Sequence, residues 1–239
     1  MIVSRQIKEV LASTPTGFVL TTRDFGIEMR YQPALVKALS RLVKLGTLQK
    51  IAKGKYYIPK KTVFGTLKPT DTELIKDFLE KDGNIIGYIT GTSAFASMGL
   101  TTQISASTLI GTNKNKRTTV RAGKKISFLL QENPITSDNI PLLRILDALR
   151  MINKIPATSP DECVSKICRI IKNLSTDRQD LLLNLSLNYT PFVRALLGAI
   201  YETIGLNAYK IGQSLNGTTK YKIPITDTTL TNKKNWNIV

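Results

Sequence analysis

Histidine is absent from this 239-residue sequence, and its absence excludes several common kinds of catalytic and metal-binding site. Without imidazole there is no Ser-His-Asp or Cys-His catalytic pair, and no histidine-containing metal site. Carboxylates and lysines remain as catalytic candidates, but they form no pattern that indicates a reaction. The sequence therefore predicts a protein that is not an enzyme and that uses no cofactor or metal.

Cysteine and long apolar runs are also scarce. Cys163 and Cys168 are the only cysteines, and their spacing turns through about 500° on a helix, so they share no face. They form neither a CxxC pair nor a zinc knuckle. No run approaches the roughly 18 apolar residues that span a bilayer, and the first residues lack the apolar core of a signal peptide. We expect a soluble cytoplasmic protein with no membrane partner.

Acidic residues are few and unevenly placed. The sequence holds 17 Asp and Glu against 34 Lys and Arg, a net charge of +17. Residues 1–61 hold 12 basic and 3 acidic side chains, a net charge of +9. Residues 33–61 contain no acidic residue. A short, strongly basic N-terminal segment before a larger and less basic one predicts an N-terminal domain that binds a polyanion.

The pattern of residues 1–61 is typical of a winged helix-turn-helix. Pro33 suits the first turn of the clearest helix, Leu35 and Leu39 recur on its apolar side, and Gly46 is the expected residue after its end. Gly54 allows a tight turn between two short strands. The elements expected in order are a helix over 4–12, a strand around 18–20, a brief helix over 21–25, the helix from 33 to 45, and strands over 48–51 and 56–58.

Residues 66–226 predict a larger mixed α/β domain after a connector over 59–65, and 227–239 predict a loose polar tail. The fold class is thus α+β. Thr70 and Glu73 suggest a capping box. The further elements expected are a helix from 70 to 83, a strand over 84–90, a short helix from 92, strands with basic turns within 107–131, helices over 142–152, 159–174, 177–187 and 190–205, and a closing hairpin around Asn216 and Gly217.

The helix from Pro33 and the turn at Gly54 are the predicted DNA contacts. In a winged helix-turn-helix the third helix enters the major groove, while the wing reaches phosphates. Glutamine can read adenine, and arginine or lysine can read guanine. A solvated helix face that docks protein is the alternative. The predicted DNA-binding residues are Tyr31, Gln32, Lys37, Arg41, Lys44, Lys53 and Lys55.

Three further stretches need an interpretation. A basic strip within 113–125 either extends a nucleic-acid or antitoxin surface or forms two solvated turns. Residues 90–103 lack the spacing and the lysine of a P-loop, so they indicate close helix–strand packing. The acids between Asp71 and Asp82 indicate a charged, exposed helix face rather than a metal site. The members of the basic strip are Lys114, Lys116, Arg117, Arg121, Lys124 and Lys125.

The run PALVKALSRLVKLGTLQKIAKGKYYIP resembles the N-terminal domain of the AbiEi family, the antitoxins of type IV toxin–antitoxin systems. The matching features are the helix from Ala34 to Leu42, Gly46, and Gly54 with the two residues after it. TGTSAFASMGLTTQ, ILDALRMINK and SLNGTTKYKI resemble segments of the related DUF6088 group. In the last of these, Gly217 stands where that group has proline.

The resemblance implies a DNA-binding transcriptional repressor of its own operon. Lys37, Arg41, Lys53 and Lys55 match the exposed helix and wing of the AbiEi family. The C-terminal domain is then expected to counter a toxin resembling a nucleotidyltransferase, without forming a stable complex with it. Two alternatives stay open: a winged-helix regulator that responds to a small ligand without any toxin, and an RNA-binding protein.

Overall fold

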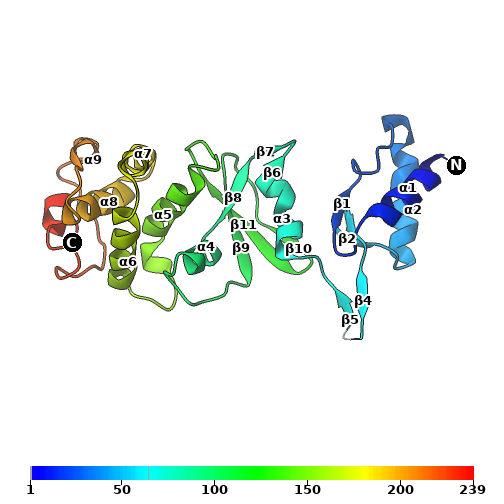
Figure 1. Ribbon diagram of the computed structural model, residues 1–239, viewed down its shortest axis with the longest axis horizontal. Coiled ribbons are helices and arrows are strands. Elements are labelled where there is room, and N and C mark those ends of the chain that lie inside the picture. The colour runs from blue at the N-terminus through cyan, green and yellow to red at the C-terminus, as the bar shows by residue number, and fades with distance from the viewer. Residues whose placement is uncertain (1, 64) are drawn as a thin grey trace. The chain divides into compact units, whose positions relative to one another are not determined.

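The computed structural model describes residues 2–63 and 65–239, and its contacts divide the chain into two units (Figure 1). Unit 1 comprises Met1–Asp77 with Val120–Lys124, and unit 2 comprises Phe78–Thr119 with Lys125–Val239. Each unit has a buried apolar cluster of its own. Helices and small sheets occur together, so the predicted α+β class is confirmed at this level.

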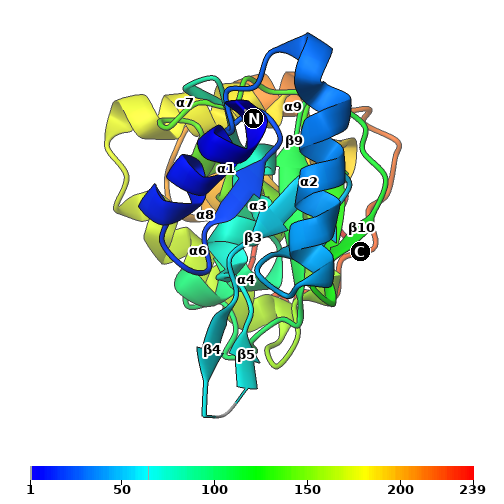
Figure 2. The ribbon, with the colours of Figure 1, turned by 90° about the vertical axis from the view of Figure 1, so that its right-hand side faces the viewer.

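Unit 1 packs two helices on a small antiparallel sheet with strand order β1-β3-β2 (Figure 2). Ile7, Leu35 and Leu39 from the helices and Tyr56 from the middle strand are buried together. The elements are α1 (Ile2–Ser13), β1 (Val19–Thr21), the 3-10 helix η1 (Met29–Tyr31), α2 (Gln32–Lys44), β2 (Gln49–Ala52), β3 (Lys55–Tyr57), β4 (Lys60–Thr62) and β5 (Gly65–Leu67).

Helix α2 begins and ends as its sequence predicts. Pro33 lies in the first turn, where its missing N–H costs no helical hydrogen bond. Gly46 has a φ of 72°, a conformation that glycine adopts without strain. The next two N–H groups, of Thr47 and Leu48, then donate back to the carbonyl of Leu42. These bonds satisfy the end of the helix and direct the chain into β2.

Two expectations for unit 1 are wrong. The helix predicted over 21–25 is a turn, because the Asp24 carboxylate accepts hydrogen bonds from the N–H and the hydroxyl of Thr21, at 2.6 and 3.0 Å. The connector predicted over 59–65 instead contributes to a hairpin, in which β4 pairs with β5 and Lys60 lies opposite Leu67. Local side-chain bonding and strand pairing overrode the propensities that the predictions used.

Helix α3 (Asp71–Leu79) is shorter than predicted. Thr70 caps it by accepting the N–H of Glu73 at 3.3 Å. The carboxylate of Glu73 accepts the backbone N–H of Val19 at 2.9 Å, which explains why it is not committed to a capping box. The helix ends at Leu79, and the hairpin of β6 (Glu80–Lys81) and β7 (Asn84–Ile85) replaces the last turn expected before Gly83.

Within unit 2, the main sheet has the strand order β11-β9-β8. β9 lies between β8, which is antiparallel to it, and β11, which is parallel to it. Ile110 and Ile126 on these strands are fully buried. The elements are β8 (Gly87–Thr90), α4 (Thr92–Ser97), β9 (Ser107–Thr112), β10 (Thr119–Arg121) and β11 (Lys124–Leu130).

In unit 2, helices α4, α7 and α8 contact α5, whose Leu142, Leu146 and Leu149 are fully buried. The predicted start of α6 is confirmed, since Ser159 and Glu162 form a capping box. The elements are α5 (Ile140–Arg150), the 3-10 helix η2 (Ile152–Lys154), α6 (Pro160–Lys172), α7 (Thr176–Ser186), α8 (Pro191–Thr203), α9 (Tyr209–Gln213) and the 3-10 helix η3 (Lys233–Trp236).

The C-terminal segment is packed rather than loose. The short helix α9 precedes residues 216–217, where a hairpin was expected, and the segment does not form that hairpin. Leu230 and Ile238 are buried in the core of unit 2, and Ile238 forms a parallel bridge with Tyr221. The ring of Trp236 lies so close to α8 that a Cβ on Gly198 would be 2.1 Å from it.

Within residues 2–63 and 65–239, no helix is both long enough and apolar enough to cross a membrane.

Candidate nucleic-acid interface

Three basic side chains, Lys37, Arg41 and Lys44, follow one exposed side of α2. Their spacings of four and three residues place them on neighbouring turns of the same helix face. Among the described residues, none of the three pairs with a carboxylate. We call this set the α2 stripe. It presents positive charge that the fold itself does not neutralise.

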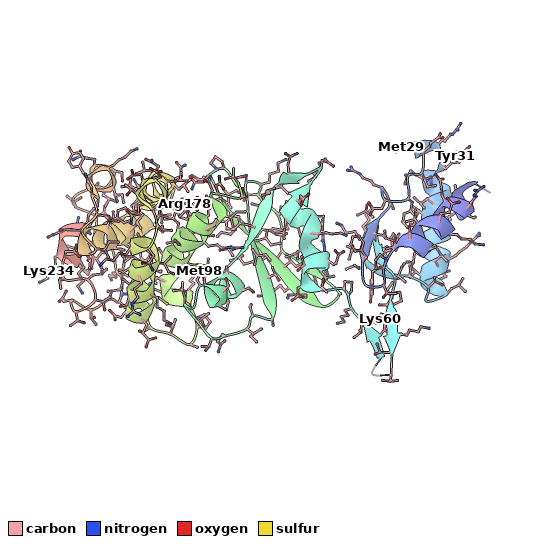
Figure 3. All side chains as sticks on the ribbon, viewed as in Figure 1. Met29, Tyr31, Lys60, Met98, Arg178 and Lys234 are labelled. Atoms are coloured by element: carbon pink, nitrogen blue, oxygen red, sulfur yellow. The ribbon has the colours of Figure 1, made fainter. Side chains whose placement is uncertain are left out.

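A groove of about 420 Å³ lies between α1 and α2. Lys37 and Arg41 of the stripe line it together with Tyr31. The guanidinium of Arg30 lies 4.8 Å from the centre of the Tyr31 ring and also pairs with Glu28 at 2.8 Å. Figure 3 shows Met29 and Tyr31 beside one another at the start of α2. The predicted contact residue Tyr31 is therefore next to the stripe, with a cation stacked on its ring.

Gln32 is less available than predicted. Its side-chain Nε2 donates to the carbonyl of Ile27 at 3.0 Å, and the residue is half-buried. Bidentate reading of adenine needs both ends of the amide. In this conformation Gln32 holds the loop before α2, so it is a poor base reader.

Lys53 and Lys55 of the β2–β3 hairpin were both predicted to contact DNA, but their surroundings differ in the structure. Gly54 turns the chain with a φ of 69°, and Lys53 beside it is exposed. Lys55 instead points to Asp77 and pairs with it at 2.5 Å, with only 17% of its side chain exposed. Burial lowers the pKa of Lys55, against the opposing effect of Asp77. Lys55 therefore leaves the candidate DNA surface, and Lys53 remains on it.

Asp77 also holds Arg121, which is only 6% exposed. The two guanidinium Nη atoms lie 2.5 and 3.1 Å from its carboxylate oxygens, and Nη1 also donates to the carbonyl of Leu74 at 2.6 Å. Burial alone would raise the pKa of Asp77, but hydrogen bonds from Arg121 and Lys55 outweigh it and hold that pKa below its usual value. Asp77 is thus a structural anchor, which corrects the prediction of a fully exposed acidic face.

The predicted basic strip does not form one surface. Arg121 is buried, and Lys124 forms an ion pair with Asp71. In unit 2, Lys116 lies over the aromatic rings of Phe78 and Phe128, 4.9 and 5.7 Å from their centres. The remaining members are exposed: Lys114, Arg117 and Lys125.

The described residues contain no group of three or more Cys, Asp or Glu side chains placed to hold a metal ion. Both cysteines are free thiols. Burial raises the pKa of Cys168 to about 11, and burial also raises that of Cys163. Thiols with raised pKa values are weak nucleophiles at neutral pH.

A family model described as a family of unknown function, DUF6088, matches residues 6–179. The chain belongs to the DUF6088 family. No curated protein matches the chain in sequence. A crystal structure of the RV2827C protein from Mycobacterium tuberculosis is similar in fold, with a TM-score of 0.50 and 14% sequence identity over 91% of this chain and 83% of that one.

The DUF6088 match includes residues 90–103, the segment that lacks the features of a P-loop. Gly91 has a φ of 70°, and a Cβ there would lie 3.1 Å from Leu109. Leu100 is fully buried, and the hydroxyl of Thr101 donates to the carbonyl of Pro156 at 2.5 Å. The glycine and the hydroxyl therefore serve close packing, as the sequence indicated.

The DUF6088 match also includes a buried carboxylate that the sequence reading missed. Asp147 lies in α5 with no exposed surface. It accepts hydrogen bonds from the hydroxyls of Tyr88, Thr90 and Tyr189, at 2.7, 2.7 and 2.9 Å. Gln131 donates to both tyrosine hydroxyls. The signal was present in the sequence: an acid on the apolar side of the helix ILDALR needs buried partners.

Proposed function

We propose that the protein binds duplex DNA sequence-specifically through α2 and the β2–β3 hairpin, arranged as a winged helix-turn-helix. The observation that carries this proposal is the α2 stripe, three exposed cations without an acidic partner among the described residues. Residues 33–61 contribute no acid that could neutralise it. Unneutralised, clustered Lys and Arg on one helix are the electrostatic footprint of a nucleic-acid contact.

The dimensions support the same proposal. An α-helix is about 10–12 Å across with its side chains, and the major groove is about 12 Å wide. With α2 in the groove, Arg41 is the residue suited to read a guanine by two hydrogen bonds. Lys53 at the hairpin turn is suited to a phosphate, which fixes orientation without reading sequence.

The regulatory role is proposed from the family resemblance. We infer that DNA binding represses the chain's own operon, and that unit 2 counters a nucleotidyltransferase-like toxin without a stable complex. The features that carry the resemblance are present as structural features, since α2 spans Ala34 to Leu42 and both Gly46 and Gly54 have positive φ.

A ligand-responsive regulator is the second candidate, because unit 2 has a cavity of about 400 Å³ at its C-terminal segment. Tyr209 and Trp236 line it with the amides of Asn216 and Asn237. Aromatic walls with a few polar groups are typical of small-molecule sites. Co-expression separates the candidates: rescue of growth from the neighbouring toxin supports the antitoxin, and its absence favours the ligand-responsive regulator.

The test of DNA binding is fluorescence anisotropy of the full chain with the duplex upstream of its gene and with a scrambled duplex, at two salt concentrations. We expect preference for the native duplex to persist at the higher salt. Arg41→Ala should remove about 1–3 kcal/mol of the specific binding free energy if Arg41 reads a guanine. Arg169→Ala, an exposed arginine in unit 2, is the matched control.

Equal and strongly salt-dependent binding of both duplexes by the wild type would contradict sequence-specific recognition. The N-terminal unit would then act as a general polyanion clamp, and RNA would become the better candidate ligand.

A further inference from the structure

We propose that the β4–β5 hairpin is a second nucleic-acid contact, an arm that binds duplex phosphates beside the groove occupied by α2. We call it the β-arm, the described residues 59–63 and 65–68. The inference rests on the proposed DNA binding and adds to it a surface that the sequence reading took for a connector.

The β-arm is not explained by the core of unit 1. Its strands are exposed or half-buried along their described length, and no described residue of the arm belongs to the buried cluster of unit 1. Val63 is 93% exposed and Leu67 is 50% exposed. A two-stranded hairpin alone is at best marginally stable in water. A hairpin that contributes so little burial therefore indicates a surface that meets a partner.

The charge of the β-arm indicates which partner. Lys60, Lys61 and Lys68 lie within residues 59–68, which contain no acid. Lys60 and Lys61 are exposed, and among the described residues neither pairs with a carboxylate. Figure 3 labels Lys60 on this hairpin. Successive side chains of a strand point to opposite faces, so Lys60 and Lys61 extend from the two faces of β4 and can reach phosphates on either side of the hairpin. They would repel another basic surface, such as a second copy of unit 1.

The base of the β-arm adjoins the end of α2. Leu45, Gly46 and Thr47, which follow α2, line a hollow of about 440 Å³ together with Pro59, Lys60 and Lys61. Lys44, the last cation of the α2 stripe, immediately precedes this hollow in sequence. The two basic surfaces thus meet at the C-terminal end of α2 and can contact one duplex.

The reach of the β-arm is sufficient for phosphates outside the groove that α2 occupies. Its strands of three residues span about 10 Å. Successive phosphates on one strand are about 3.4 Å apart along the axis. The arm can therefore follow roughly three nucleotides of backbone. Contacts of this kind add affinity and salt dependence but no base specificity.

The test is anisotropy of the full chain with a random duplex of three helical turns, measured across a salt series. The double variant Lys60→Ala/Lys61→Ala should lose roughly tenfold or more in affinity, and its salt slope should fall by about two units, since each phosphate contact contributes about 0.9. The control is Lys81→Ala/Lys172→Ala, which removes two exposed lysines from unit 2. It makes the same change in net charge and should stay within about twofold of wild type.

Lys60→Arg/Lys61→Arg should keep the wild-type salt slope, because phosphate contact needs the charge. Equal affinity and slope for the alanine double variant and wild type would overturn the β-arm inference. If Arg41→Ala has meanwhile lost specific binding, the proposed function stands without the arm. If wild type binds no duplex, both proposals fail together. A variant that keeps DNA binding but loses activity against the toxin would also overturn the inference, in favour of a protein contact.

Discussion

Asp147 is a buried acid whose charge state depends on the side chains that surround it in the folded protein. Its carboxylate has no exposed surface, and three hydroxyls donate to it. Burial is the largest influence and raises its pKa above the usual value of 3.8, because it outweighs the opposing hydroxyl hydrogen bonds. Protons therefore bind Asp147 more tightly in the folded chain than in the unfolded chain.

The raised pKa predicts how Asp147 affects stability with pH. Between 3.8 and the raised folded-state value, the unfolded chain has already lost the proton that the folded chain keeps. Stability from this group therefore falls as pH rises through that window. Asp147→Asn should abolish this fall. Thermal midpoints of both proteins should be measured from acidic to neutral pH. The midpoint of the wild type should fall relative to that of the variant as pH rises.

Asp138→Asn, which changes an exposed acid, is the control for Asp147. Its midpoint measures the effect of removing one exposed carboxylate, and the pH profile of Asp147→Asn is compared with it. A wild-type advantage over Asp147→Asn that stays constant or widens with rising pH would contradict a raised pKa.

The sequence shows where the lysines are in the chain, but it does not show which residue each one contacts in the folded protein. Lys53 and Lys55 flank the same glycine, and no local pattern distinguishes them. Their difference arises from Asp77, which is 22 residues after Lys55 in the chain and meets it only in the folded unit. Arg121 contacts the same carboxylate from 44 residues further on. Partners at such separations are set by tertiary packing, which no local pattern contains.

At the scale of elements, the sequence predicted best where two local signals agree. Pro33 and Gly46 mark both ends of α2 and its apolar period fills the space between, so its limits were close to correct. α6 likewise has a capping box and an apolar face. The β-arm was missed because its short strands have no buried face to impose an alternating pattern, and its pairing is visible only in the structure.

The packing of η3 against α8 predicts a large effect from one methyl group. A Cβ on Gly198, a buried residue of α8, would lie 2.1 Å from the ring of Trp236. Gly198→Ala should lower the free energy of unfolding by about 1–3 kcal/mol through overpacking. Denaturant unfolding followed by the emission of Trp236, the only tryptophan in the sequence, measures this change.

Gly212→Ala is the matched control, because a Cβ there would meet the same ring at 3.9 Å, an ordinary contact. It should be neutral or slightly stabilising, since alanine favours a helix over glycine. Equal destabilisation by the two substitutions would contradict the close contact between Trp236 and α8.

At the scale of the whole molecule, the net charge of +17 does not mean that every basic side chain is free to bind a polyanion. The acids of α3 neutralise Lys55, Arg121 and Lys124 within unit 1. The proposed DNA surface retains six exposed cations: Lys37, Arg41, Lys44, Lys53, Lys60 and Lys61. Charge counting on the sequence located the basic N-terminal segment but could not show that part of it is internally paired.

This division predicts the salt dependence of binding. If the five cations other than Arg41, which is proposed to read a base, all contact phosphate, the slope of log K against log salt should reach a magnitude of about 4.5. Lys53→Ala should reduce that magnitude by about one unit. Lys55→Met keeps the apolar length of the side chain and should leave the slope unchanged, because Lys55 faces Asp77. Titrations across a salt series measure both variants, and the opposite ranking would show that Lys55 is the phosphate contact.

The long sequence separation between Asp77 and Arg121 has a consequence during synthesis. The buried cluster of unit 1 is complete by Tyr56, yet the arginine that closes on Asp77 follows 44 residues after that acid. At about 5–20 residues per second, a ribosome needs about 2–9 s to cover that separation. For that interval the nascent helix α2 and its hairpin have a core but lack the Arg121 anchor.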